Sequence, residues 1–128
     1  MMKKGGRISD ANLEIMNYIW EKGEATISEV LEAANARRPK NLKRATIQVQ
    51  VRRLEKYGWL SHREVNRTFV YFPIKDGETA KVDIMKGIRK RVFDGSCLDL
   101  VKCLISGGDI SNREIHRIEE FLRSERER

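Results

Sequence analysis

Residues 46–54, with the sequence TIQVQVRRL, carry side-chain types that bind nucleic acid when they share one face of a helix. Their spacing allows two interpretations. Alternation of Ile and Val with Gln is typical of a strand, whereas Ile47, Val51 and Leu54, spaced four and three residues apart, are typical of a helix. A strand would leave the following RRLEKYG too short for a helix of its own. The spacing therefore predicts one helix over residues 45–57.

This helix would place polar and basic side chains on the face opposite its apolar stripe. Thr46 lies near the N-terminus, where backbone N–H groups and the helix dipole favour a phosphate. Gln48 can pair with adenine, and Arg52 with guanine or with phosphate. Val49 stands among arginines, and a thymine methyl group in the major groove would give it an apolar partner. The face is predicted to bind double-stranded DNA.

Basic charge is concentrated around this helix. The chain has a net charge of +7; residues 1–75 carry 15 Lys and Arg against 8 Asp and Glu, and residues 76–128 carry 11 of each. Solvated side chains on an exposed helix are the alternative explanation of the basic face. The basic residues before and after the helix favour a polyanion instead. The residues predicted to bind DNA are Lys43, Arg44, Thr46, Gln48, Val49, Arg52, Arg53, Arg63 and Arg67.

The elements around this helix have the order of a winged helix-turn-helix. Ser9 is a predicted N-cap of a first helix, and Thr26 with Glu29 predicts a capping box at the start of a second. Pro39 excludes helix from the basic connector that follows. Strand-like runs at 60–64 and 68–72 predict a hairpin with its turn near Asn66. Residues 1–75 are therefore predicted to form a winged-helix DNA-binding domain.

Residues 76–128 are predicted to be helical only, with helices over 80–93 and 97–105 and a third capped by Ser111 and Glu114. A segment of this length is too short to bury its apolar side chains in a core of its own. A second copy of the chain is therefore expected to cover them. The predicted fold is mostly α with a small β-hairpin, and its second domain is a dimerisation domain. The residues predicted to form the dimer are Ile84, Ile88, Leu98, Val101, Leu104, Ile115, Ile118, Phe121 and Leu122.

Composition excludes several other classes of protein. The sequence has no apolar run long enough for a membrane span and no signal-peptide core, so a cytoplasmic location is expected. Cys97 and Cys103 are expected to be buried free thiols, and a metal- or ligand-responsive regulator using them is one alternative function. A winged-helix adaptor that binds an acidic protein is another. Neither His62 nor His116 stands at catalytic or metal-ligand spacing, so no enzyme, cofactor or metal site is predicted.

Taken together, these residues make the chain resemble the penicillinase-repressor family, the winged-helix repressors of β-lactamase and methicillin-resistance genes, which also includes copper-responsive repressors. The resemblance covers nearly the whole length. It is carried by ISDANLEIMNYIW near the start, TI with RRLEKYGWL in the third helix, RTFVYFP in the second strand, and FDGSCLDLV at the start of the second C-terminal helix.

The resemblance implies a homodimer that binds a pseudo-palindromic operator, often with TACA and TGTA half-sites, and blocks transcription. In several members a membrane sensor protease cleaves the repressor in the second dimerisation helix, between Asn and Phe. The matching pair here is Cys103 and Leu104. The sequence differs from the family at the entry to the third helix, where Leu42 takes the place of a Trp, and it lacks the Cys-x-Cys tail of the copper-responsive members.

Overall fold

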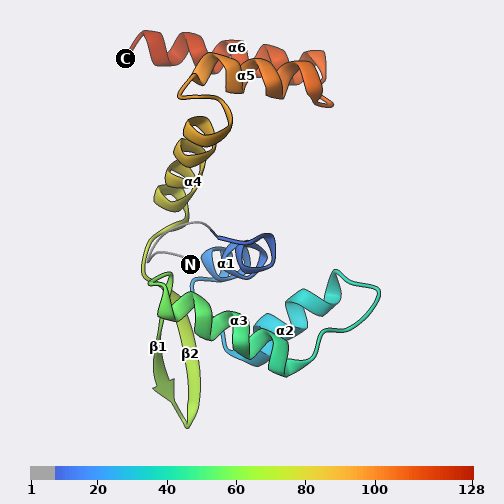
Figure 1. Cartoon of the computed structure of the whole chain (residues 1–128), viewed down its shortest axis with the longest axis vertical. Coiled ribbons are helices and arrows are strands. Elements are labelled where there is room, and N and C mark those ends of the chain that lie inside the picture. The colour runs from blue at the N-terminus through green and yellow to red at the C-terminus, as the bar shows by residue number, and fades with distance from the viewer. Residues whose placement is uncertain (1–7) are drawn as a thin grey trace. The chain divides into compact units, whose positions relative to one another are not determined.

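The computed structural model describes residues 8–128 as helices with one hairpin (Figure 1). Contacts divide the chain into two compact units, one ending at Ile84 and the other beginning at Met85, so the two units share one helix. The elements are α1 (Asp10–Lys22), α2 (Ile27–Ala36), α3 (Arg44–Lys56), β1 (Leu60–Val65), β2 (Thr68–Pro73), α4 (Gly77–Val92), α5 (Cys97–Gly107) and α6 (Asn112–Arg126). The mostly helical fold class with a small hairpin is confirmed.

The core of the first unit is built from one apolar stripe on each helix and the inner face of the hairpin. Met16 and Ile19 of α1 are fully buried, as are Val51 of α3 and Leu60 of β1. Burial of such stripes, rather than intrinsic helix propensity, supplies most of the stability of short helices. The core also includes Ile15, Ala25, Val30, Ala34, Ile47, Leu54, Trp59, Tyr71 and Ala80.

Local hydrogen bonds fix where α1 and α2 begin. The Ser9 hydroxyl accepts a hydrogen bond from the Asn12 backbone N–H at 3.2 Å. The Thr26 hydroxyl accepts from the Glu29 N–H at 3.2 Å, and the Glu29 carboxylate accepts from the Thr26 N–H at 2.8 Å. Both predicted caps are confirmed, and the second is a complete capping box.

The helix predicted over residues 45–57 is confirmed, since α3 spans Arg44–Lys56. Ile47, Val51 and Leu54 are at most 1% exposed, as the helical spacing requires. Gly58 follows with a φ of +86°, a conformation that L side chains rarely adopt. The chain can therefore reverse there, and the Trp59 N–H donates to the Leu54 carbonyl at 2.9 Å.

The predicted hairpin is confirmed as an antiparallel pair in which Leu60 faces Pro73 and Val65 faces Thr68. Asn66 and Arg67 both have positive φ, 49° and 65°, as a two-residue type I′ turn requires. Ala25 and Tyr71 exchange two backbone hydrogen bonds of 2.9 and 2.8 Å, which attach β2 to the link between α1 and α2.

The second unit has little interior of its own. No residue of α5 or α6 is buried, although both helices carry many apolar side chains. Ser111 caps α6 by accepting from the Glu114 N–H at 3.1 Å. In the part of the chain that the structure describes, Glu114 makes no return bond, so the capping box predicted there is wrong and only its first half forms. From residue 8 onward, no helix has the length and apolar character needed to cross a bilayer.

Candidate nucleic-acid interface

The face of α3 opposite the core is open to solvent. Thr46, Arg52, Arg53 and Lys56 are exposed, and Gln48 is half-buried at the flank. Val49 is 52% exposed, on the side of α3 that the helical spacing turns away from the core. This arrangement is the one that the helical spacing predicts, with an apolar side chain at the centre of a polar and basic surface.

The N-terminal end of α3 keeps its positive character. Lys43 is the N-cap residue and makes no side-chain capping bond, so the first N–H groups of the helix lack an acidic or hydroxyl partner within the described part of the chain. Such an end attracts anions. Arg44 extends back to α2, where its Nη1 donates to the Ser28 hydroxyl at 2.8 Å. Thr46 is the third residue of α3, so it lies on the exposed face within the first turn of the helix.

A concave surface of about 300 Å³ lies between α3, the start of α2 and the hairpin. It brings together four of the residues predicted to bind DNA, Arg44, Gln48, Arg52 and Arg67, which are up to 23 positions apart in the sequence. Of the residues that the structure describes, no acidic one lines it. The remaining lining residues are Thr26, Ile27, Thr68, Phe69 and Tyr71, none of which was predicted from the sequence.

Two predicted wing residues differ in their environment. Arg67 lines the concave surface at the turn of the hairpin. Arg63 instead donates from one Nη2 to both carboxylate oxygens of Glu24 at 2.8 Å. Because this ion pair is about half exposed on both sides, it contributes little stability. It nevertheless offsets the charge of Arg63, so Arg67 carries more of the free charge of the hairpin.

An aromatic and ionic cluster joins the hairpin to α3. His62 Nδ1 lies 2.6 Å from Glu55 Oε2, and its ring stacks on Phe69 with centroids 4.2 Å apart. Phe69 is 44% exposed despite this contact. The pKa of Tyr71 is raised, first by burial and then by the Glu55 carboxylate, while Arg52 acts in the opposite direction. The Tyr71 hydroxyl therefore stays protonated at neutral pH and can donate a hydrogen bond.

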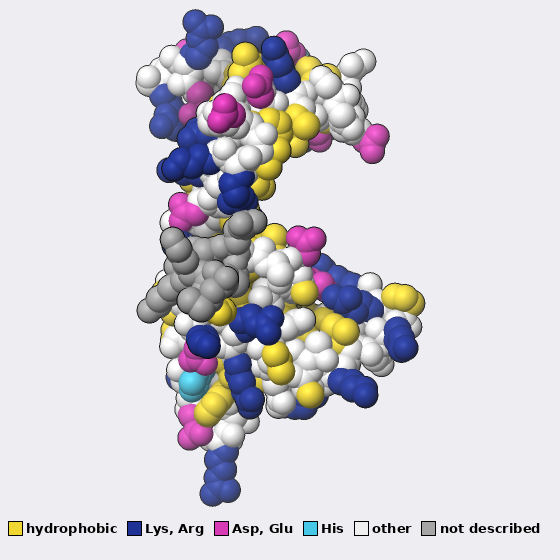
Figure 2. Space-filling view, in the orientation of Figure 1, with side chains coloured by type: hydrophobic (Ala, Val, Ile, Leu, Met, Phe, Trp, Pro, Cys, Tyr) yellow, Lys and Arg dark blue, Asp and Glu magenta, His cyan; other side chains and the backbone are white. Residues whose placement is uncertain are grey.

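The residues predicted to form a dimer lie in the second unit and at its edge. Ile84, Ile88, Ile115 and Ile118 are half-buried within one chain. The others are exposed: Leu98 by 62%, Val101 by 37%, Leu104 by 54%, Phe121 by 61% and Leu122 by 54%. Figure 2 shows yellow apolar side chains on the surface of these helices.

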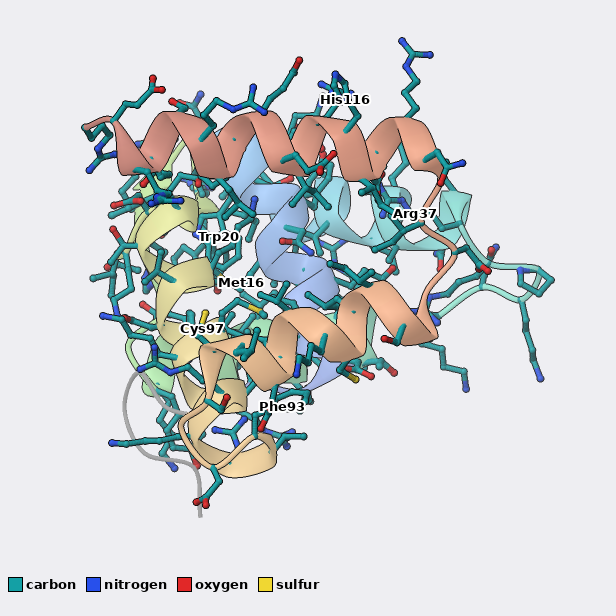
Figure 3. All side chains as sticks on the ribbon, turned by 90° about the horizontal axis from the view of Figure 1, so that it is seen from above. Met16, Trp20, Arg37, Phe93, Cys97 and His116 are labelled. Atoms are coloured by element: carbon teal, nitrogen blue, oxygen red, sulfur yellow. The ribbon has the colours of Figure 1, made fainter. Side chains whose placement is uncertain are left out.

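The prediction that Cys97 and Cys103 are buried is wrong for the single chain, because both thiols are exposed. They lie on α5, none of whose residues is buried in one copy. Figure 3 shows Cys97 at the start of α5 and His116 on the side of α6 that faces away from α5. Over residues 8–128, no group of three or more His, Cys, Asp and Glu is arranged to hold a metal ion.

Comparison with known proteins gives one consistent result. The model of the penicillinase repressor family matches residues 8–124. The penicillinase repressor of Bacillus licheniformis is 30% identical over 99% of this chain and 98% of its own length. The methicillin resistance regulatory protein MecI of Staphylococcus aureus is 28% identical over 95% of this chain and 98% of its own.

A solved structure of a relative matches part of the chain. The solution structure of monomeric Bacillus licheniformis BlaI in complex with the blaP half-operator is 38% identical, with a TM-score of 0.50. The match covers 60% of this chain and 92% of that one. The matched portion is long enough to hold the helices and the hairpin that form the basic surface described above.

Proposed function

The chain belongs to the penicillinase repressor family and is a DNA-binding transcriptional repressor, not an enzyme, and we propose that it acts as a homodimer on a pseudo-palindromic operator. In this proposal each copy inserts α3 into a major groove, and the two copies occupy related half-sites. A location in the cytoplasm, where the chromosome is accessible, follows from the same proposal. The adaptor and the metal-responsive regulator are not favoured by these relatives.

The observation that carries the proposal is the exposed face of α3. Val49 sits at its centre with Thr46, Gln48 and Arg52 around it, and its opposite face is anchored in the core. A rigid backbone holds these side chains, so little ordering is needed when they meet base edges. Thr46 would contact phosphate, Gln48 adenine, Arg52 guanine or phosphate, and Val49 a thymine methyl group.

The apolar surface of α5 and α6 supports the homodimer. Six of its large apolar side chains are more than one third exposed, which a stable single chain rarely tolerates on so short a segment. A second copy offers the same surface in return, and a two-fold interface lets each patch cover the other. The same two-fold symmetry would match a pseudo-palindromic operator.

Linking two half-site contacts raises the affinity for the operator by mass action, because the second contact becomes intramolecular. A cut between Cys103 and Leu104 would divide α5 and separate the two winged helices. We include a membrane sensor protease acting at this bond in the proposal, since both residues are exposed in the single chain. Loss of the dimer would then release the operator.

Binding as a function of salt concentration tests the proposal. The probe is a duplex selected in vitro from random DNA by the full chain, with a scrambled duplex as control. We expect the logarithm of the affinity to fall linearly with the logarithm of the salt concentration, with a slope of about −0.9 per phosphate contact. Absence of an enriched sequence, or a slope near zero, would contradict the proposal.

A further inference from the structure

We infer that the loop between α2 and α3 is a second DNA-contact site, which binds backbone phosphates beyond the base pairs that α3 contacts. The inference rests on the proposed binding mode of α3. The loop covers residues 37–43 and projects at the end of α3 opposite the hairpin (Figure 1). It is therefore placed to extend the interface along the duplex in the direction that the hairpin does not reach.

The loop is held at two points by hydrogen bonds from outside it. The Asn35 side chain accepts from the Leu42 N–H at 2.7 Å and donates to the Leu42 carbonyl at 3.4 Å. Arg38 donates from Nη2 to Glu14 of α1 at 2.7 Å. Pro39 further restricts the backbone between these anchors. A loop held in this way loses little conformational freedom when it binds a ligand.

The cations of this segment divide into two groups. Arg38 is paired with Glu14, and Arg44 is bonded to Ser28. Arg37, Lys40 and Lys43 are exposed, and within residues 8–128 the charged groups of their side chains make no hydrogen bond or ion pair. One arginine therefore fixes the loop, and the other three cations of the loop remain available to bind an anion.

The chemistry of the free cations fits phosphate and not bases. The loop carries no acidic residue, and two of its three exposed cations are lysines, which act as point charges on flexible side chains. One of them, Lys43, is the N-cap residue of α3, and this helix terminus already favours anions. The ligand class is therefore the phosphodiester backbone flanking each half-site, and the loop would add affinity without sequence preference.

The test compares two double variants with equal loss of charge. Arg37→Gln with Lys40→Gln removes two loop cations, whereas Arg113→Gln with Arg117→Gln removes two exposed cations from α6. The probes are the selected operator cut to its core and the same operator extended by about one helical turn, ~10 bp, at each end. For the extended probe we expect the loop variant to flatten the salt slope by about 0.9 per lost contact, and the α6 variant to leave it unchanged.

Two further measurements locate the effect. Ethylation of phosphates outside the core should weaken binding of the wild type and of the charge-conserving Arg37→Lys, Lys40→Arg variant, but not of the loop variant. Equal slopes and equal interference patterns for the loop and α6 variants would overturn the inference while leaving DNA binding by α3 intact. Failure of the wild type to select any duplex would instead overturn both the inference and the proposed binding mode.

Discussion

Replacing Phe121 by alanine is expected to separate the two copies of the chain. Phe121 is 61% exposed in one copy, and a phenylalanine has about 200 Å² of accessible surface. Roughly 120 Å² of this side chain is therefore accessible to solvent and could be buried by a second copy. At about 25 cal/mol per Å², full cover by a second copy is worth ~3 kcal/mol for each side chain. The symmetric interface contains this side chain twice. After allowance for the remaining alanine, the loss is roughly 4–5 kcal/mol, or about three orders of magnitude in the dimer dissociation constant.

Sedimentation equilibrium over a range of protein concentrations measures this change directly. His116→Ala is the matched control, because His116 lies on the same helix but on the side facing away from α5 (Figure 3). We expect the control to dimerise like the wild type. If Phe121→Ala and the wild type showed the same dissociation constant, the apolar surface of α6 would not be the dimer contact, and the reasoning from exposed area would be refuted.

The same variant separates dimerisation from recognition by α3. Phe121 lies outside the unit that contains α3, so a duplex with one half-site should bind the variant and the wild type with similar affinity. A duplex with two half-sites should bind the wild type far more tightly, because only the dimer gains the effective-concentration term. Equal loss on both duplexes would indicate that the substitution damages the fold and does not act through the dimer.

Three further predictions concern the first unit. Arg52→Ala should weaken operator binding by roughly 1–3 kcal/mol, measured by fluorescence anisotropy, whereas unchanged affinity would remove Arg52 from the interface. Leu54→Ala, at a position 1% exposed, should lower the free energy of unfolding by about 2–5 kcal/mol in urea denaturation. The pKa of Asp76 is lowered below 3.8, chiefly by the Thr79 backbone N–H, so its contribution to stability is present above that value and is lost as the pH falls through the folded-state pKa. Thermal unfolding measured between about pH 5 and pH 2, the range in which Asp side chains titrate, should therefore show a smaller loss of stability on acidification for Asp76→Ala than for the wild type.

Local patterns in the sequence were sufficient to predict most of the first unit. The capping box of Thr26 and Glu29 depends on residues three apart, and the apolar stripe of α3 repeats within two turns. Both are decided by neighbours in the chain, so the structure agrees with them. The positions of Thr46, Val49 and Arg52 on the open face follow from the same periodicity.

Contacts between distant residues could not be predicted in this way. Arg63 meets Glu24 across 39 positions, and that pairing depends on how the hairpin attaches to the link between α1 and α2. His62 and Glu55 are seven positions apart but belong to different elements, joined by the reversal at Gly58. The concave surface that includes Phe69 arises from the same packing. The only signal for it in the sequence is the alternation of side chains along β2, which places Phe69 and Tyr71 on one face.

The distribution of free charge along α3 follows from these pairings and predicts an asymmetric contact with DNA. At the hairpin end, Glu24 offsets Arg63, and His62 with Phe69 presents an aromatic surface beside Arg67 and the exposed Arg52, Arg53 and Lys56 of α3. At the loop end, free cations adjoin an uncapped helix terminus. Salt screens the ionic contacts at both ends, but it does not screen the aromatic contacts that the hairpin end adds. High salt should therefore release the loop end first, while shape and apolar contacts at the hairpin end keep α3 in register.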